Sequence, residues 1–264
     1  MKKMFAIVLS LIMSASCFAG CAAETSDSDL DYVKDNGKLI VGITDYAPMD
    51  YKDENGEWTG FDAELARLFA KELGVEIEFF VIADWSKKVF ELDSKNIDVI
   101  WNGMTINDEL KATTNCSKPY VLNAQVIVTK ADIAGNYTTA DSIKDLTIAV
   151  ENGSTGEGVL KDLGITDYVA VDDQSKAIME VAAGTSEACI VDITAANAMT
   201  GEGTSYPDLK IALSLNEEEY GVGFRKGSDI TAKFNEFLEK CKEDGTLADL
   251  AAKYELNLAD WLKS

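Results

Sequence analysis

The polar side chains with the clearest chemical use follow predicted strands, and their types suit the non-covalent binding of a charged solute. Ser154 and Thr155 lie in the glycine-containing run 152–156, directly before a predicted helix. Either side chain can cap that helix, and the backbone amides left free carry a partial positive charge that favours a carboxylate. A simple N-cap is the alternative interpretation, and it is compatible with the same binding role.

A second group of such residues follows the apolar run 99–101. Gly103 lets a ligand approach the backbone closely, because glycine has no side chain. The Thr105 hydroxyl can bond a carboxylate or an amine. Asn102 can read a polar group of the ligand or cap the turn that follows.

Residue types that indicate catalysis or a metal are scarce. The chain has no histidine, which removes the usual general base and the usual zinc ligand. Cys116, Cys189 and Cys241 are far apart and odd in number, so they predict small buried side chains and no disulfide framework. We therefore expect no metal and no cofactor.

Residues 1–20 have the form of a secretion signal. Lys2 and Lys3 precede a nearly apolar run, which is shorter than the about 20 residues that a membrane-spanning helix needs. Small residues before Cys21 resemble a bacterial lipoprotein box, which predicts cleavage after residue 20 and a lipid anchor on Cys21. Cys17 is a weaker candidate, and a secreted protein without lipid is the alternative. The polar, acidic composition after Cys21 predicts a flexible tether at 21–36.

The net charge limits the possible partners. It is −22 for the whole chain and becomes −24 once Lys2 and Lys3 are removed. Such a surface repels phosphate backbones, so nucleic-acid binding is not expected. Electrostatic attraction to anionic lipid is equally unfavourable, so membrane attachment has to come from the lipid on Cys21.

The body of the chain alternates strand and helix patterns, which is typical of an α/β fold. Strands are predicted at 38–43, 75–81, 99–101, 124–129, 147–150, 168–171, 188–191, 210–213 and 220–227. Helices are predicted at 61–73, 85–92, 156–163, 175–183, 193–199, 230–242 and 246–254. The pattern restarts near residue 147, which predicts two similar α/β units with a ligand cleft at the carboxyl ends of the strands.

The second unit is predicted to be inserted in the first. The extended runs near Gln125 and Val222 would then be paired crossovers between two lobes. This division gives lobe 1 residues 37–125 and 222–264, and lobe 2 residues 126–221.

Three segments resemble the polar amino-acid substrate-binding proteins of ABC importers. They are GFDAELA at 60–66, NIDVIWNGMTI at 96–106 and SKPY at 117–120, and the resemblance extends over about residues 38–254. It implies a two-lobed, periplasmic-binding-protein-like (type II) fold with two mostly parallel sheets and a two-strand hinge, closed by ligand. It also implies capture of an amino acid or related amine-bearing solute outside the cell membrane, delivery to ABC permease subunits, and no enzymatic activity. A monomer is the default expectation.

The resemblance implies further ligand contacts. Asp45 is implied to hold the polar end of the ligand, and Tyr46 and Trp85 to place rings against it, which suits a cationic or flat group. Asp192 is implied to pair with an α-ammonium, a strong contact in a closed cleft. The alternatives are a turn residue at 45, a surface aromatic at 46, a core residue at 85 and a helix cap at 192.

The chain departs from the family's pattern at Leu110, where similar proteins usually have an arginine that binds the α-carboxylate. Either the amides of residues 154–156 hold the carboxylate together with Thr105, or the ligand is not a standard α-amino acid. Glu151 and the acidic surroundings favour a cationic or zwitterionic ligand that carries an amine.

Two other functions stay open at this point. The first is a lyase similar to cyclohexadienyl dehydratase, which has the same fold and needs a placed acid such as Glu151 or Glu157 and a clamp for an anionic substrate. The lack of histidine and of the arginine argues against it. The second is a stand-alone sensor that docks to a signalling partner.

Overall fold

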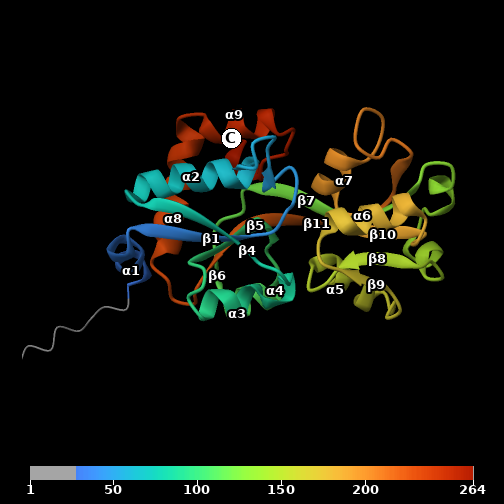
Figure 1. Ribbon diagram of the computed structural model, residues 1–264, viewed down its shortest axis with the longest axis horizontal. Coiled ribbons are helices and arrows are strands. Elements are labelled where there is room, and N and C mark those ends of the chain that lie inside the picture. The colour runs from blue at the N-terminus through green and yellow to red at the C-terminus, as the bar shows by residue number, and fades with distance from the viewer. Residues whose placement is uncertain (1–27, 264) are drawn as a thin grey trace, which may run out of the picture.

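The strand order shows two groups of strands, one for each lobe, joined by a long antiparallel pair of strands that belongs to both. The computed structural model describes residues 28–263, so the predicted signal peptide and Cys21 lie outside the described residues. The strand order is β4-β1-β5-β11-β7-β10-β8-β9, and β6 (Asn115–Cys116) pairs with β11. Figure 1 shows the two lobes side by side, with β7 (Val121–Lys130) and β11 (Leu209–Phe224) running between them.

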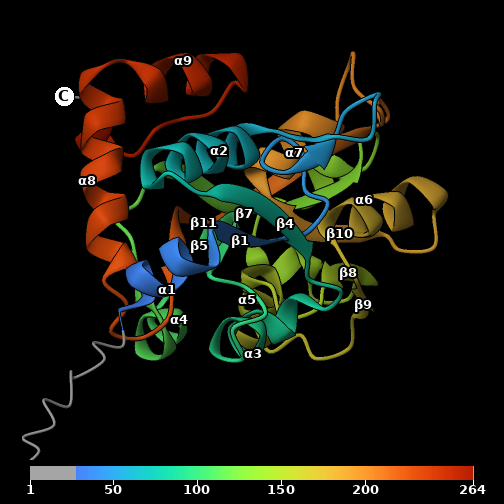
Figure 2. The same ribbon diagram turned by 60° about the vertical axis from the view of Figure 1, so that its left-hand side comes forward.

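Lobe 1 is built on three parallel strands. They are β1 (Lys38–Ile43), β4 (Glu76–Val81) and β5 (Val99–Thr105), and the last part of β11 pairs antiparallel with β5. One face is covered by α2 (Phe61–Leu73), α8 (Ile230–Glu243) and α9 (Thr246–Lys253), which Figure 2 shows meeting at one corner of the lobe. The other face is covered by η1 (Trp85–Lys87), α3 (Lys88–Asp93) and α4 (Asp108–Thr113). A short hairpin joins β2 (Tyr51–Lys52) to β3 (Trp58–Thr59).

Lobe 2 repeats this plan on a smaller scale. The strands β8 (Ile148–Glu151), β9 (Val169–Val171) and β10 (Ala188–Asp192) are parallel, and β10 pairs antiparallel with β7. The helices α6 (Gln174–Ala183) and α7 (Ile193–Met199) pack on one face, and α5 (Thr155–Asp162) packs on the other. The sequence therefore predicted the α/β class and the alternation of elements correctly.

The return crossing between the lobes is one long strand, whereas the sequence predicted two short ones at 210–213 and 220–227. Gln125 on β7 pairs with Asn216 on β11, and the register slips twice between Ile211 and Asn216. The apolar cluster of lobe 2 includes Leu215, and that of lobe 1 includes Tyr220. The polar run between them hid the continuity of the strand, because an alternating apolar pattern is absent there.

The predicted tether at 21–36 is wrong for its last part. Residues 29–36 form the helix α1, which Ser28 caps by accepting a hydrogen bond from the amide of Asp31. Asp29 is buried and forms an ion pair with Arg225 at 2.9 Å, and Arg225 also bonds Asp98. This pairing across the chain cannot be read from the local composition that suggested a tether. Between residues 28 and 263 no helix is both long and apolar enough to cross a membrane.

Candidate ligand-binding site

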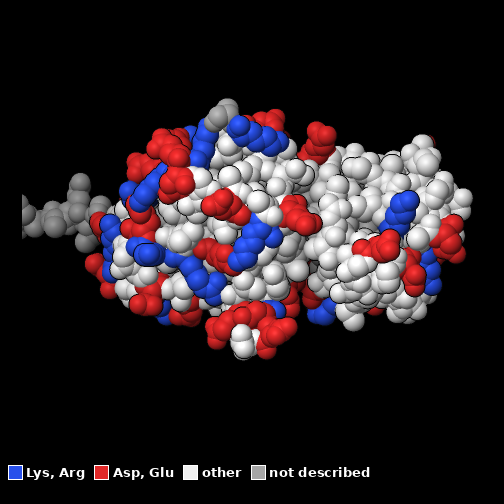
Figure 3. All heavy atoms as spheres, turned by 90° about the horizontal axis from the view of Figure 1, so that it is seen from above, with Lys and Arg blue, Asp and Glu red and all other residues white. Residues whose placement is uncertain are grey.

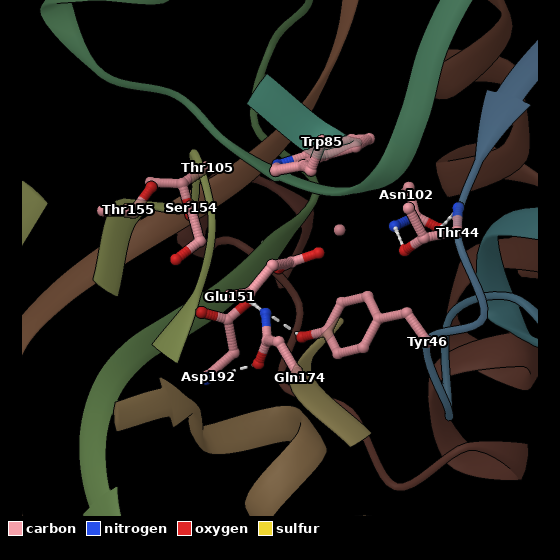
Figure 4. Close-up of a pocket in the computed structure, with 11 residues that line it drawn as sticks. Thr44, Tyr46, Trp85, Asn102, Thr105, Glu151, Ser154, Thr155, Gln174 and Asp192 are labelled. Atoms are coloured by element: carbon pink, nitrogen blue, oxygen red, sulfur yellow. Dashed lines mark hydrogen bonds between the residues drawn. The ribbon is translucent and has the colours of Figure 1, made fainter. Parts of the chain in front are cut away.

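The strand ends of both lobes meet at one small pocket, which we call the inner pocket. Lobe 1 contributes side chains from the loop after β1, from η1 and from β5, and lobe 2 contributes side chains from the ends of β8 and β10 and from the α5 and α6 N-termini (Figure 4). Its eleven lining residues are Thr44, Tyr46, Trp85, Asn102, Gly103, Thr105, Glu151, Ser154, Thr155, Gln174 and Asp192. This is the place where open α/β sheets bind ligands.

Eight of the nine residues predicted to touch ligand line this pocket, and Asp45 does not. Asp45 is exposed, although loss of water around its carboxyl group and the charge of nearby Asp173 raise the pKa of that group. The turn interpretation of Asp45 therefore agrees with its position better than a direct ligand contact does.

Tyr46 joins the two lobes. Its hydroxyl donates to the Asp192 carboxylate at 2.9 Å, and it lies 2.6 Å from the hydroxyls of Thr194 and Tyr220. Burial and the charge of Asp192 raise the pKa of Tyr46 well above its usual value, so the phenol stays a donor. The ring is therefore both a wall of the inner pocket and a clasp between the lobes.

Asp192 is already surrounded by donors from the protein. Its carboxylate accepts bonds from Tyr220 at 2.7 Å and from Gln174 at 3.0 Å, in addition to those from Tyr46 and Gln125. Gln174 also accepts the backbone amide of Asp192 at 2.8 Å. An ammonium group at this carboxylate would have to share or replace these donors.

Glu151 is the acid that points into the inner pocket, where Figure 4 shows it beside Tyr46 and below Trp85. Only 5% of its surface is exposed. Burial and the neighbouring Asp192 raise the pKa of Glu151 to about 8, although Lys88 acts in the opposite direction. A carboxyl with this pKa exchanges its proton near neutral pH and becomes a strong partner for a cation when it ionises.

A third acid lies behind the pocket, on the strand pair that joins the lobes. Glu218 accepts hydrogen bonds from Thr105 at 3.0 Å, from Gln125 at 2.6 Å and from Asn123 at 2.5 Å. Burial and Asp192 raise its pKa to about 7. Three carboxyl groups therefore crowd this region.

Trp85 forms the roof of the pocket and is linked to lobe 2 through Lys88. The Lys88 ammonium lies 5.0 Å from the centre of the Trp85 ring. It donates to the carbonyl of Trp85 at 3.3 Å and to that of Gly153, in lobe 2, at 3.0 Å. Gly153 has a φ of +72°, and a side chain there would lie 2.5 Å from the Ser86 backbone, so a glycine is required for this close approach of the lobes.

Asn102 and Gly103 make their close contacts with other residues of lobe 1. The Asn102 side chain accepts the Thr44 amide at 2.9 Å and donates to the Thr44 hydroxyl at 2.6 Å. Gly103 has a φ of +55°, and a Cβ atom there would lie 2.5 Å from the Tyr46 ring. The missing side chain of Gly103 therefore makes room for the Tyr46 ring, and the predicted close approach of a ligand at Gly103 stays a prediction.

The N-terminus of α5 is partly occupied by the protein's own acid. The Ser154 hydroxyl accepts the amide of Glu157 at 3.2 Å, as expected of an N-cap. The Glu157 carboxylate accepts the amide of Gly153 at 3.0 Å. This arrangement is close to a capping box, so part of the positive potential of this helix end is already used.

Sequence reasoning missed Thr44 and Gln174 as lining residues, and it named Glu151 only as an acidic neighbour of the site and as the acid that the lyase alternative needs. Each of them directly follows or ends a strand, or begins a helix, as the predicted residues do. Glu151 ends β8 in the same way that Asp192 ends β10. That shared position is the signal that would have found it. Leu110, in place of the arginine usual in similar proteins, is buried in an apolar cluster with Trp85 and Met104.

Groups of side chains that could hold a metal ion are absent from residues 28–263. Cys189 and Cys241 are buried free thiols, and Cys116 is half-buried and also free. Figure 3 shows charges of both signs over lobe 1 and a mostly uncharged lobe 2 on the face in view.

Known proteins with similar sequences are solute-binding proteins. The profile of the bacterial extracellular solute-binding proteins, family 3, matches residues 39–257. The L-cystine-binding protein TcyJ of Escherichia coli K12 is 31% identical over 92% of this chain and 92% of its own. The arginine-binding extracellular protein ArtP of Bacillus subtilis is 32% identical over 92% of this chain and 96% of its own.

A solved structure shares the fold closely. The ancestral amino acid-binding protein AncCDT-1, described as a precursor of cyclohexadienyl dehydratase, is 31% identical. It superposes with a TM-score of 0.77 and covers 86% of this chain and 99% of its own.

Proposed function

Because the chain belongs to the bacterial extracellular solute-binding proteins of family 3, we propose that it captures an amino acid or a related amine-bearing solute between its two lobes and delivers it to an ABC permease. The predicted family and the two-lobed type II fold are confirmed. The curated relatives are named as binding proteins, so the chain is a binding protein and not an enzyme. The relatives' own ligands, L-cystine and arginine, support a ligand of this class.

The observation that carries the proposal is the meeting of both lobes at one buried acidic pocket. Tyr46 and Trp85 come from lobe 1, and Glu151 and Asp192 come from lobe 2. The pocket holds free space of only about 20 Å³, which is room for about one water molecule. A solute therefore enters when the lobes part, and its contacts to both lobes favour the closed form.

Calorimetric titration of the purified protein with amino acids and amines tests the proposal. We expect at least one of them to bind, and we expect Asp192→Asn to weaken that binding by about 2 kcal/mol, or about 30-fold. Asp172→Asn is the matched control, because Asp172 is exposed and bonds only Lys176 in the described structure. Unchanged affinity in Asp192→Asn would contradict its assigned role, and failure of every amino acid and amine to bind would contradict the proposed function.

We also propose that the protein is anchored to the outer face of the cell membrane through lipid on Cys21, as a monomer. The support is the leader sequence at 1–20 together with the extracellular family. Metabolic labelling with an alkyne fatty acid should mark the wild-type protein and Cys17→Ala but not Cys21→Ala. Label that persists in Cys21→Ala would contradict the assignment.

A further inference from the structure

The charges around the inner pocket are unbalanced. Of its eleven described lining residues, Glu151 and Asp192 are acids and none is a base. Glu218 adds a third carboxyl through Thr105 and Gln125. An isolated buried carboxylate is unfavourable, so these acids require either protons or a cation.

Three buried or half-buried cations of lobe 1 are bound to other groups of the protein. The Lys88 ammonium is bound to two backbone carbonyls, and burial lowers its pKa. Arg225 is bound to Asp29 and Asp98. Arg67 donates to the carbonyl of Trp58 at 2.5 Å. Lys88 is the cation whose charge acts on Glu151, and it is already bound to the carbonyls of Trp85 and Gly153. None of the described lining residues carries a positive charge, so a ligand cation can take the place of the proton on Glu151.

Several hydrogen-bond donors among the polar side chains of the pocket are already used by the protein. The Thr105 hydroxyl donates its proton to Glu218, which leaves its lone pairs facing the pocket. The Asn102 amide is used by Thr44, and the Tyr46 hydroxyl is used by Asp192. These acceptors suit the N–H groups of an ammonium or guanidinium.

A free carboxylate finds little in the same pocket. At the α5 N-terminus, where backbone amides could meet an anion, Glu157 already accepts the Gly153 amide. A ligand carboxylate at that point would also meet the negative charge of Glu151 once that group ionises.

We propose that the inner pocket recognises an organic ammonium or guanidinium cation and makes no net favourable contact with a ligand carboxylate. This inference rests on the proposed function and narrows its ligand class. The cation lies between Glu151 and the Trp85 ring, which adds a cation–π contact. The rest of the solute extends into a wider groove between the lobes, which shares Trp85, Thr105, Ser154 and Thr155 with the inner pocket. Diamines and decarboxylated amino acids are therefore expected to bind at least as tightly as the parent amino acids.

Matched ligand pairs test this inference on the purified full chain. We would titrate arginine against agmatine, lysine against cadaverine and ornithine against putrescine, with serine as a zwitterion of zero net charge. The expected result is equal or tighter binding of the decarboxylated member of every pair that binds. A parent amino acid that binds more tightly than its decarboxylated form, or binding of serine alone, overturns the inference and leaves the proposed function standing. Failure of all these ligands and of the wider amino-acid set overturns both.

A charge-neutral variant shows which group receives the cation. Glu151→Gln keeps the size of the side chain and should lower the affinity for the tightest amine at least tenfold. Glu202→Gln is the control, because Glu202 is exposed and does not line the pocket. The thermal unfolding midpoint of each ligand-free variant shows whether it folds. A folded Glu151→Gln protein with wild-type affinity for the amine overturns the inference.

Discussion

The Tyr46 hydroxyl of lobe 1 donates to the Asp192 carboxylate of lobe 2 at 2.9 Å, so one phenol binds the two halves together at the floor of the site. A ligand group that bonds Asp192 would compete with the Tyr46 hydroxyl, whereas a ligand that contacts both lobes elsewhere in the pocket would strengthen the closed form. Opening of the lobes breaks it, and the buried carboxylate then loses a donor.

The first prediction concerns this clasp. Tyr46→Phe removes the donor and keeps the ring, so the closed form should lose about 1.5–3 kcal/mol, the usual value for a bond to a charged group. The radius of gyration of the ligand-free protein in small-angle X-ray scattering should rise. Tyr168→Phe is the control, since it removes a tyrosine–carboxylate bond that lies within lobe 2. An unchanged scattering profile in Tyr46→Phe would show that the clasp does not hold the lobes.

The second prediction concerns the pH dependence of affinity. Burial and Asp192 raise the pKa of Glu151 to about 8, so a cationic ligand must displace its proton below that pH. Affinity for an amine should therefore rise from pH 6 to pH 8, by up to about tenfold per pH unit for one proton. Calorimetry in buffers with different ionisation enthalpies measures the released proton. Glu151→Gln should remove this slope, and a slope that persists there would assign the proton to another group.

The third prediction concerns the pH dependence of stability without ligand. Burial raises the pKa of Asp62 and Glu218 to about 7, and burial with Asp192 raises that of Glu151 to about 8. An acid whose folded pKa lies above its unfolded pKa stabilises the fold when protonated, and this stability is lost as pH rises through the folded pKa. The unfolding midpoint of the ligand-free protein should therefore fall between pH 5 and pH 8. The fall should be smaller in Glu151→Gln and unchanged in Glu202→Gln.

The fourth prediction concerns Lys88. Lys88→Met removes the bond to Gly153 in lobe 2 and a positive charge that lowers the pKa of Glu151. The lobes should open more readily, and the pH at which amine affinity levels off should move upward. Scattering and calorimetry against pH measure the two effects. The neighbouring Lys87→Met, at an exposed position, should leave both unchanged.

The fifth prediction concerns the docking of α1. Asp29→Ala leaves the buried Arg225 with one acidic partner fewer, which should cost on the order of 3 kcal/mol of stability. Denaturant unfolding measures this loss, and ligand affinity should stay the same. Asp31→Ala, on the exposed side of the same helix, is expected to cost far less. Equal stability of the two variants would show that the ion pair does not hold α1.

The sequence predicted the place of the site better than its internal contacts. Residues that end parallel strands gather at one edge of a sheet, so the strand pattern indicated that Thr105 and Ser154 lie near one cleft, and the family resemblance added Asp192. The contacts of Asp192 with Tyr46 and Tyr220 depend on how two lobes close, and no local pattern contains that information. For the same reason the partner of Asp29 could not be predicted, because Arg225 lies far away in the sequence.

The helix α1 near the start of the chain and the helices α8 and α9 near its end all belong to lobe 1 (Figure 1). Within residues 28–263 the chain passes between the lobes along β7 and β11. Residues 28 and 263 therefore both lie on the lobe 1 side of this strand pair, and bending of β7 and β11 would move lobe 2 without changing the distance between those two residues.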